Sequence, residues 1–544
     1  MKKKCIFANQ NYMANRTELL VIRCLLVILM AGCAVSCTKD TPFTEITGHT
    51  GLKGDDQNPE PGVRLGRRLP NAYSLTNMQA AYNILHQGSS HSVSSQEDNL
   101  TPTHLYLSIK VNDTLTLTHL LEDTTIDVFP YPLDYELIGS GEYEPEDPYT
   151  VYAVVPINWN ISDFNVNIIE QCVIPDDDDE EMQEVERKAL QMAGYTLVGG
   201  DKSWGQCPDG YIKVWNTRTE SLEGVRDIKL KMNVLVKVRN VYTSANGHYH
   251  SNSKFYVNVN YTAFFDNRQG FRIWDNTICI LPAMFCLGTH APSGYNYSFW
   301  RTSKGWRIAT TNNGVCAYNQ MLNDGLEITA PPSDMRISVM SLNTSSGDGE
   351  WLGSTPMFYH RIRNDATYAQ FMAMFCISGG LILALPDMFI FNNDISTVSQ
   401  YATIFHEFSH VSHYAQVGGN YWSLLVGDEI VGVGYGDTNS SWLSQRVGVS
   451  EMWGYYAEGM LEEQYWEIYH SDTSFNEIYG GEHWFRPQIL YEITDTIPEV
   501  SLLSIFGCLQ SNVYEFNTFK NAIKNSVNSQ YHEYIDSLFN TIHY

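Results

Sequence analysis

The sequence predicts a multidomain α+β protein, and three observations lead to this fold class. The chain has 544 residues and 43% hydrophobic content, enough for two or three domains that each bury a core. Apolar and polar residues alternate at period two between about 210 and 276, the pattern of half-buried strands. After residue 451 the apolar residues instead recur at helical spacing.

The first 36 residues are typical of a secretory signal. Lys2–Lys4 precede the apolar run Cys24–Ala31, which is too short and too early to span a membrane in the mature protein. Small residues then precede Cys37, as is typical of a lipidation site, and Cys33 has the same kind of context. We expect Cys37 to carry the lipid, so that a membrane of the cell envelope anchors the protein. Mass spectrometry of the mature N-terminus tests this expectation.

Residues 37–68 are rich in Gly, Pro, Asp and Thr without periodicity, which is typical of a flexible tether. An N-terminal α+β domain is expected at 69–205, and it contains no catalytic cluster. Its predicted elements are helices at Ser74–Gln87 and Glu181–Ala193 and strands around His104–Lys110, Thr125–Phe129 and Tyr149–Val155.

A small β-sandwich is predicted at 206–280. Gly224-Val225 and the run from Thr243 to Tyr249 resemble the transthyretin-like, Ig-like regulatory modules of carboxypeptidases. The resemblance implies a spacer or a binding surface without chemistry of its own. The predicted strands are Tyr211–Trp215, Ile228–Val238 and Phe255–Tyr261, with a turn at Asn246-Gly247.

The remaining residues, 281–544, form the candidate catalytic domain. A sheet-bearing part followed by a helical lobe would leave a cleft between them. The predicted elements are strands at Met335–Met340 and Pro386–Phe391 and helices at Trp306–Leu322, Phe516–Val527 and Tyr531–Phe539.

The most informative stretch is His406-Glu-Phe-Ser-His410. The segment Ser396–Gly419 has no proline and carries apolar residues at helical spacing, which predicts a helix that ends at Gly418-Gly419. Two histidines four residues apart then share one face, where their imidazoles can hold one Zn²⁺. Glu407 lies beside them, placed to act as general base on a zinc-bound water. The alternative, a buried amphipathic helix with two incidental histidines, would leave Glu407 and His410 as unexplained polar groups.

A catalytic zinc needs a third protein ligand and one open position. His413 shares the face of His406 but lies about 10.5 Å further along the helix, beyond the reach of one metal. A second helix is predicted from Ser450, as its N-cap, to about Tyr469. Glu451 would stand in the first turn of this helix, where the helix dipole favours a carboxylate. We therefore expect Glu451 to be the third ligand.

Two other acids remain alternatives to Glu451. Glu458 lies on the same helical face, seven residues later. Glu429 follows His410 at the interval seen in some zinc aminopeptidases, although its surroundings lack the Asn-Glu-Gly-Phe type of run that accompanies that spacing.

Three segments, Phe405–Tyr414, Tyr421-Trp422 and Ser450–Tyr456, resemble the zinc metallopeptidase lipoproteins of Bacteroidetes. Shorter pieces between Thr103 and Val155 resemble the same group, so the resemblance covers most of the mature chain. It implies a zincin-like domain of the gluzincin type, one Zn²⁺ per chain, and an outer-membrane lipoprotein that is periplasmic or surface-exposed. Gly454 departs from the alanine that related sequences tend to have, and we expect it to loosen the helix while leaving the ligand in place.

Composition narrows the possible partners. The formal net charge of −27 argues against nucleic-acid binding, because nucleic-acid phosphates would be repelled. Seven cysteines follow Cys37, and this odd number does not imply a full disulfide framework.

Together these features predict a zinc-dependent peptidase at the cell envelope, with a protein or peptide as its substrate. Three residues, Tyr455, His483 and Tyr435, are candidate donors to the transition state. The alternative is a non-catalytic surface lipoprotein with a degenerate peptidase fold, which captures peptide or glycan. A glycosidase is a weaker option because no pair of acids has a recognisable context.

Overall fold

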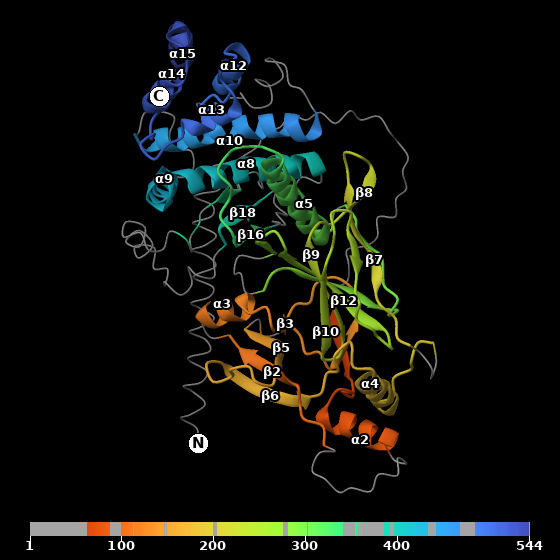
Figure 1. The fold of residues 1–544 in the computed structure, drawn as a ribbon. Helices are drawn as coiled ribbons and strands as arrows, with labels where there is room; N and C mark the ends of the chain where they lie inside the picture. The colour runs from red at the N-terminus through yellow and green to blue at the C-terminus, as the bar shows by residue number, and fades with distance from the viewer. Residues whose placement is uncertain are drawn as a thin grey trace, which may run out of the picture. The chain divides into compact units, whose positions relative to one another are not determined.

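The computed structural model confirms the predicted fold class: the chain is a mixed α+β protein with several sheets (Figure 1). Its described residues form two compact units, 62–313 and 314–542, and the division falls inside helix α5 (Lys304–Asn323). Cys37, the expected signal sequence and most of the expected tether lie outside the described residues. These are 62–86, 99–111, 114–145, 147, 149–199, 204–275, 281–301, 303–340, 354–356, 358, 361, 386–391, 396–432, 442–467 and 485–542.

The N-terminal part of the first unit contains a four-stranded antiparallel sheet. The predicted strands are confirmed to within two residues at each end, and their inward side chains, such as Leu107, Ile109 and Ala153, form a fully buried core. The strand order is β3-β5-β2-β6, with β3 at Asp127–Phe129, β5 at Thr150–Pro156, β2 at His104–Lys110 and β6 at Asn165–Cys172. The helices are α2 (Leu75–His86), α3 (Thr114–Glu122) and α4 (Glu180–Met192).

The next residues form two further sheets, as the period-two pattern predicts. One has the order β10-β9-β12-β13 with β14 also paired to β12, and the other has the order β11-β7-β15 with β8 paired to β7. Two of these strands, β14 (Met284–His290) and β15 (Tyr297–Phe299), come from beyond residue 280. The others are β7 (Asp209–Asn216), β8 (Ser221–Gly224), β9 (Ile228–Val234), β10 (Lys237–Tyr242), β11 (His248–His250), β12 (Val259–Asn267) and β13 (Phe271–Trp274).

Two strand predictions in this region are wrong. The segment predicted as one strand at Ile228–Val238 is a hairpin, because Leu235 adopts a left-handed conformation with a φ of 52° and reverses the chain. The strand predicted at Phe255–Tyr261 begins only at Val259 and extends to Asn267. An apolar run alone does not reveal where its backbone finds a pairing partner.

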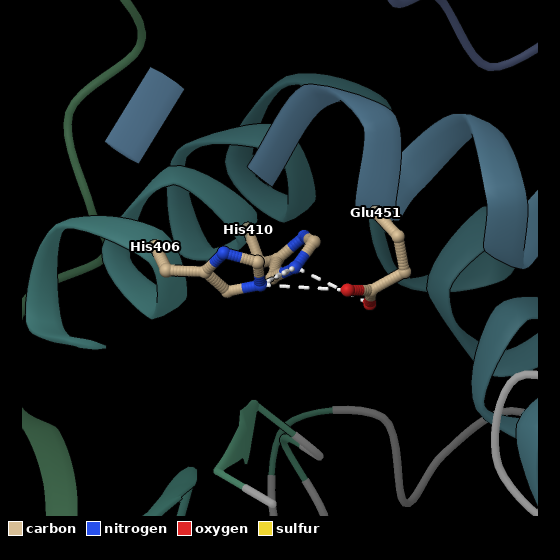
Figure 2. Close-up of side chains that lie close together, drawn as sticks. All are labelled: His406, His410 and Glu451. Carbon is tan, nitrogen blue, oxygen red and sulfur yellow. Dashed lines mark hydrogen bonds and ion pairs between the residues drawn. The ribbon is translucent and has the colours of Figure 1, made fainter. Parts of the chain in front are cut away.

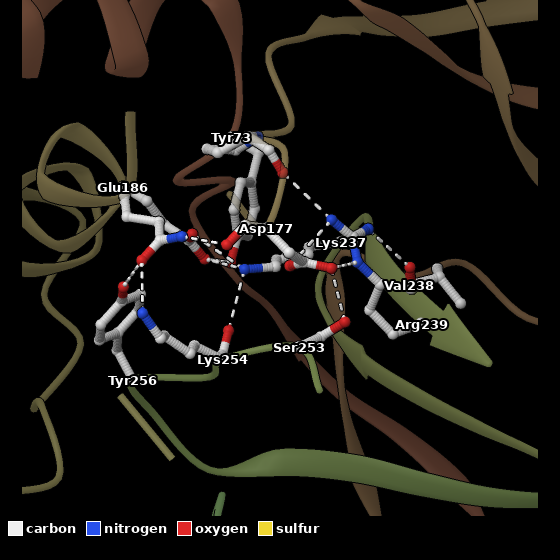
Figure 3. A network of polar contacts seen from close by, with 11 residues as sticks. Tyr73, Asp177, Glu186, Lys237, Val238, Arg239, Ser253, Lys254 and Tyr256 are labelled. Atoms are coloured by element: carbon white, nitrogen blue, oxygen red, sulfur yellow. Dashed lines mark hydrogen bonds and ion pairs between the residues drawn. The ribbon is translucent and has the colours of Figure 1, made fainter. Parts of the chain in front are cut away.

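A buried ion pair joins helix α4 to strand β10 in the first unit (Figure 3). Nζ of Lys237 donates to both carboxylate oxygens of Glu186, each at 2.9 Å, and to the carbonyl oxygen of Lys254 at 3.0 Å. The hydroxyl of Tyr73, which precedes α2, donates to Glu186 at 2.6 Å. The side chains of Lys237 and Glu186 are 2% and 1% exposed, so each charge depends on the other for its compensation.

The second unit carries three paired strands followed by helices. β16 (Met335–Val339) pairs in parallel with β18 (Met388–Ile390), and β17 (Thr355–Pro356) pairs antiparallel with β18. The helices are α8 (Thr397–Val417), α9 (Gly419–Gly432), α10 (Trp442–Trp466), α12 (Gln488–Thr496), α13 (Leu502–Gly507), α14 (Phe516–Asn525) and α15 (His532–Phe539). Within the described ranges, no helix has the length and apolarity needed to cross a membrane.

Replacement of Lys237 by methionine tests the buried pair. We expect Lys237→Met to lower the free energy of unfolding by about 3–5 kcal/mol, because it leaves the Glu186 carboxylate buried without a counter-charge. The control is Lys110→Met, which removes the exposed pair with Asp147 and should cost no more than about 1 kcal/mol. Urea denaturation measures both variants, and equal losses would show that the buried pair does not stabilise this unit.

Candidate metal centre

Helix α8 positions the two histidines of the motif. Ser396 caps the helix, with a side chain that accepts a hydrogen bond from the backbone N–H of Ser399, and Gly418 ends it with a φ of 83°. His406 and His410 are one turn apart and are 3% and 2% exposed. The predicted helix and its end are therefore confirmed, and both imidazoles lie in the protein interior.

Three side chains converge in the group His406, His410 and Glu451, which could hold a metal ion (Figure 2). The Nε2 atoms of the two imidazoles are 3.1 Å apart, and each lies 3.4 Å from an oxygen of Glu451. Tetrahedral ligands at about 2.0–2.1 Å from a zinc ion are separated by about 3.3 Å. The spacing and chemistry of the three donors therefore fit one zinc ion.

Glu451 comes from helix α10, which packs along α8 (Figure 1). The prediction that this helix begins at Ser450 is wrong, because the helix begins at Trp442 and buried Val447 and Val449 continue its packed face upstream. Ser450 is not an N-cap: its Oγ lies 3.1 Å from Nδ1 of His410, on the side of the ring opposite the metal-facing nitrogen. The packing of α10 on α8 therefore places Glu451 at the site. Glu451 does not lie in the first turn of its helix, as was expected.

Glu458, the first alternative ligand, lies behind His406. Its Oε2 is 3.2 Å from Nδ1 of His406. A carboxylate at this nitrogen accepts its proton and leaves the lone pair on Nε2, the atom that faces His410 and Glu451. Glu458 thus orients a ligand and stands outside the three-residue group.

The side chains of the metal group also shift one another's pKa values. Burial lowers the pKa of His406, but the hydrogen bonds to Glu451 and Glu458 outweigh it and raise the pKa to about 10. Burial raises the pKa of Glu451, but the charge of His410 and the hydrogen bonds from both imidazoles lower it to about 2. A cation is therefore favoured at this position, and a bound metal would take the place of the proton.

Gly454 lies where α10 packs closely on the two imidazoles. A Cβ atom there would lie 2.7 Å from Nε2 of His410 and 2.9 Å from Cε1 of His406. Glu451 is in place in the metal group, as expected, but Gly454 also borders both imidazoles, which was not expected. The absence of a side chain lets the backbone of α10 approach the ligands closely.

Glu429, the second alternative ligand, is also outside the metal group but lines the same cavity. Its side chain is buried, and burial followed by the negative charges of Glu451 and Glu407 raises its pKa well above the usual range. This cavity is narrow and is lined by Pro356, Glu407, His410, Trp422, Leu425, Glu429, Ser450 and Glu451. Glu407, the expected general base, thus borders the same space as two of the three candidate ligands.

His413 is excluded from the metal group, as the helical rise predicts. Its ring packs against Tyr421 and Trp422, with centroid distances of 5.4 and 5.6 Å, and neither ring nitrogen has a hydrogen-bond partner among the described residues. Burial, followed by the charge of His410, lowers the pKa of His413 to about 3. His413 is therefore a neutral imidazole that packs against these two aromatic rings.

Of the three expected transition-state donors, only Tyr455 belongs to the described residues. Its ring packs edge-on against His406, with centroids 4.5 Å apart. Tyr435 and His483 lie outside the described residues, and their roles stay predictions. Ser450 and Gly454 also belong to the site, although neither was predicted to. The signal for Gly454 was its spacing, because Glu451, Gly454 and Glu458 follow one another at i, i+3 and i+7 on one helical face.

Comparisons of the chain with protein-family models, curated proteins and solved structures give no match. The inferences about this site therefore depend on its own residues and geometry.

The ligand assignment is tested by zinc analysis of purified, zinc-supplemented variants. We expect one zinc per wild-type chain, and none in Glu451→Ala because a ligand is lost. Glu458→Gln should keep one zinc with an affinity reduced about 10- to 100-fold, the usual cost of losing the group that orients a histidine ligand. Glu429→Ala should keep its zinc. A variant at Glu458 or Glu429 that alone empties the site would show that the assignment of Glu451 is wrong.

The glycine is tested by Gly454→Ala. We expect at least a tenfold loss of zinc affinity in a competition assay with a chelator, because the new methyl group displaces the ligand imidazoles. The matched control is Gly427→Ala on α9, where a Cβ would meet no atom within 4 Å. This control should keep full affinity and gain up to about 1 kcal/mol of stability from helix propensity. Unchanged zinc affinity in Gly454→Ala would contradict the packing argument.

Proposed function

We propose that the protein is a zinc-dependent hydrolase that cleaves peptide bonds. The observation that carries this proposal is the placement of Glu407 on the wall of the cavity that contains His410 and Glu451. A metal group and a carboxylate that lines the same pocket are components that hydrolysis of an amide requires. The spacing of the three candidate ligands supports zinc as the metal.

Two histidines and one carboxylate are also the ligand set of non-haem Fe(II) oxygenases, so the donors alone do not decide the metal. The position of Glu407 favours hydrolysis, because oxygenation has no use for a general base beside the ligands. The same argument disfavours a surface lipoprotein that only captures peptide or glycan, since binding does not need Glu407.

A bound zinc ion would supply Lewis acidity, which polarises the scissile carbonyl and makes water a stronger acid. Glu407 accepts the proton of the attacking water and returns it to the amine that leaves. Glu458 holds His406 in the tautomer that exposes Nε2, and Ser450 holds the ring of His410. Tyr455, which contacts His406, is the described candidate for a donor to the developing oxyanion.

The location of this activity depends on residues that the structure does not describe. We propose that lipid attachment at Cys37 anchors the protein to the outer membrane, which would present the site to peptides outside the cytoplasm. The acidic composition is compatible with this location and with a substrate that is not a nucleic acid.

Glu407→Gln tests the proposal. The amide has nearly the size of the carboxylate but cannot take the proton of water, so we expect turnover to fall by about 10²- to 10⁴-fold. Zinc content should stay at one per chain, because Glu407 is not one of the ligands. The measurement is cleavage of a mixed peptide library, followed by mass spectrometry. A zinc-loaded wild type that cleaves no peptide, or equal cleavage by wild type and Glu407→Gln, would contradict the proposal.

A further inference from the structure

Three charged side chains of the first unit meet where helix α5 begins. Glu142 lies in the loop after β4 (Tyr135–Ile138), Asp275 follows β13, and Lys304 is the first residue of α5. Nζ of Lys304 donates to Oε2 of Glu142 at 2.7 Å and to Oδ2 of Asp275 at 2.6 Å. The side chains of the two acids are 22% and 18% exposed. One ammonium group therefore serves two carboxyl groups that are largely removed from water.

This cluster carries an excess negative charge if both acids are ionised, and two carboxylates held together repel each other. Oε1 of Glu142 is buried and accepts no hydrogen bond from the described residues. The side chains of Glu142 and Asp275 are nevertheless hydrogen-bonded to each other. Because an ionised carboxylate can only accept hydrogen bonds, this bond requires a proton on one of the two acids.

The surroundings of the two acids assign this proton to Glu142. Burial raises the pKa of Glu142 and the charge of Asp275 raises it further, so that the opposing effect of Lys304 leaves it at about 8. Burial also raises the pKa of Asp275, but the charge of Lys304 and the hydrogen bond with Glu142 outweigh burial and lower it. Glu142 is therefore the acid of the pair and Asp275 is its carboxylate.

Hydrogen bonds to neighbouring strands hold the backbone around Glu142. Its carbonyl oxygen accepts from the N–H of Val63 at 2.8 Å, and Gly141 exchanges two backbone hydrogen bonds with Cys286 on β14, each at 2.8 Å. Burial raises the pKa of Cys286 to about 11, so this thiol is neutral. Among the described residues, the charged groups that act on Glu142 are Asp275 and Lys304. The protonation of Glu142 therefore depends on these two residues.

We propose that Glu142, Asp275 and Lys304 form a pH-sensitive latch, which holds the first turn of α5 to the loop after β4 and to the end of β13. The latch is closed while the two acids share a proton and Lys304 donates to both. Loss of the proton leaves two carboxylates that repel each other, and the start of α5 then loosens. The inference goes beyond the proposed function, because none of the three residues belongs to the metal group.

The pH range in which the latch weakens follows from the protons that each state binds. The pKa of Glu142 in the closed latch is about 8, above the ordinary value of 4.5 that it regains when the latch opens into water. The closed state therefore binds more protons than the open state. Its stabilisation is complete below the ordinary value and is lost as the pH rises through the pKa of the closed state. Between the two values, the equilibrium constant for opening increases by up to about tenfold per pH unit.

Hydrogen–deuterium exchange of residues 303–313 tests the latch, with rates corrected for the intrinsic effect of pH on exchange. We expect opening of this segment in wild type to increase about tenfold or more between about pH 6 and pH 8. Glu142→Gln should abolish this increase, because its amide donates to Asp275 and accepts from Lys304 without a proton to lose. At about pH 9 this variant should be better protected than wild type, which loss of a merely structural contact would not produce. The matched control is Glu144→Gln, which removes an exposed acid of the same loop and should keep the wild-type increase.

A second variant and a second measurement cover the case in which Glu142→Gln does not fold. Asp275→Asn removes the charge that raises the pKa of Glu142, so the increase in opening should shift to lower pH. Infrared spectra near neutral pH should contain a protonated-carboxyl band that Asp275→Asn weakens and Glu144→Gln keeps. Equal protection of wild type at about pH 6 and pH 8 would overturn the inference. So would an increase in opening that persists unchanged in Glu142→Gln or Asp275→Asn. No step of the test depends on zinc or on peptide cleavage, so its result is independent of the proposed function.

Discussion

The contact between helices α8 and α10 is the constraint on which the candidate site depends. Two imidazoles from α8 and one carboxylate from α10 meet with their donor atoms 3.1 and 3.4 Å apart, in a region that is almost wholly buried. Such a group is unfavourable in a protein interior unless its charges are compensated. The helices must therefore approach closely enough for the three groups to share one cation, and Gly454 is the residue that permits this approach.

The two units differ in how their buried charges are compensated. In the first unit, Glu186 has the ammonium of Lys237 within 2.9 Å and the hydroxyl of Tyr73 within 2.6 Å, so the cluster is complete within the chain (Figure 3). In the second unit, Glu451 and Glu429 border a cavity to which the described residues bring no lysine or arginine. A complete cluster stabilises a fold, whereas an incomplete one favours binding of a cation from outside. This difference is the physical reason for assigning chemistry to the second unit alone.

Much of the fold and the core of the candidate site could be predicted from the sequence, because both follow from local periodicity. The spacing of His406 and His410 determines that they share a helical face, and the strands that border the first core keep an alternating pattern. The hairpin at Leu235 was missed because a left-handed leucine has no sequence signature comparable to Asn-Gly. The start of α10 was missed because Ser450 resembles an N-cap, while its hydroxyl in fact lies beside His410. These features depend on tertiary packing, which periodicity does not report.

Periodicity also could not decide which of Glu451, Glu458 and Glu429 is the third ligand. Glu451 and Glu458 are seven residues apart on one face of α10, so a helical wheel treats them as equivalent. Their roles diverge because α10 is placed with Gly454 over the imidazoles, which leaves one acid in front of the ligand nitrogens and the other behind His406. A shift of two helical turns, about 10.5 Å, would bring Glu458 to the position of Glu451 but would also bring a side chain against the histidines. The position of a residue without a side chain thus determines which carboxylate joins the metal group, and Glu429, on a third helix, is left to face the cavity.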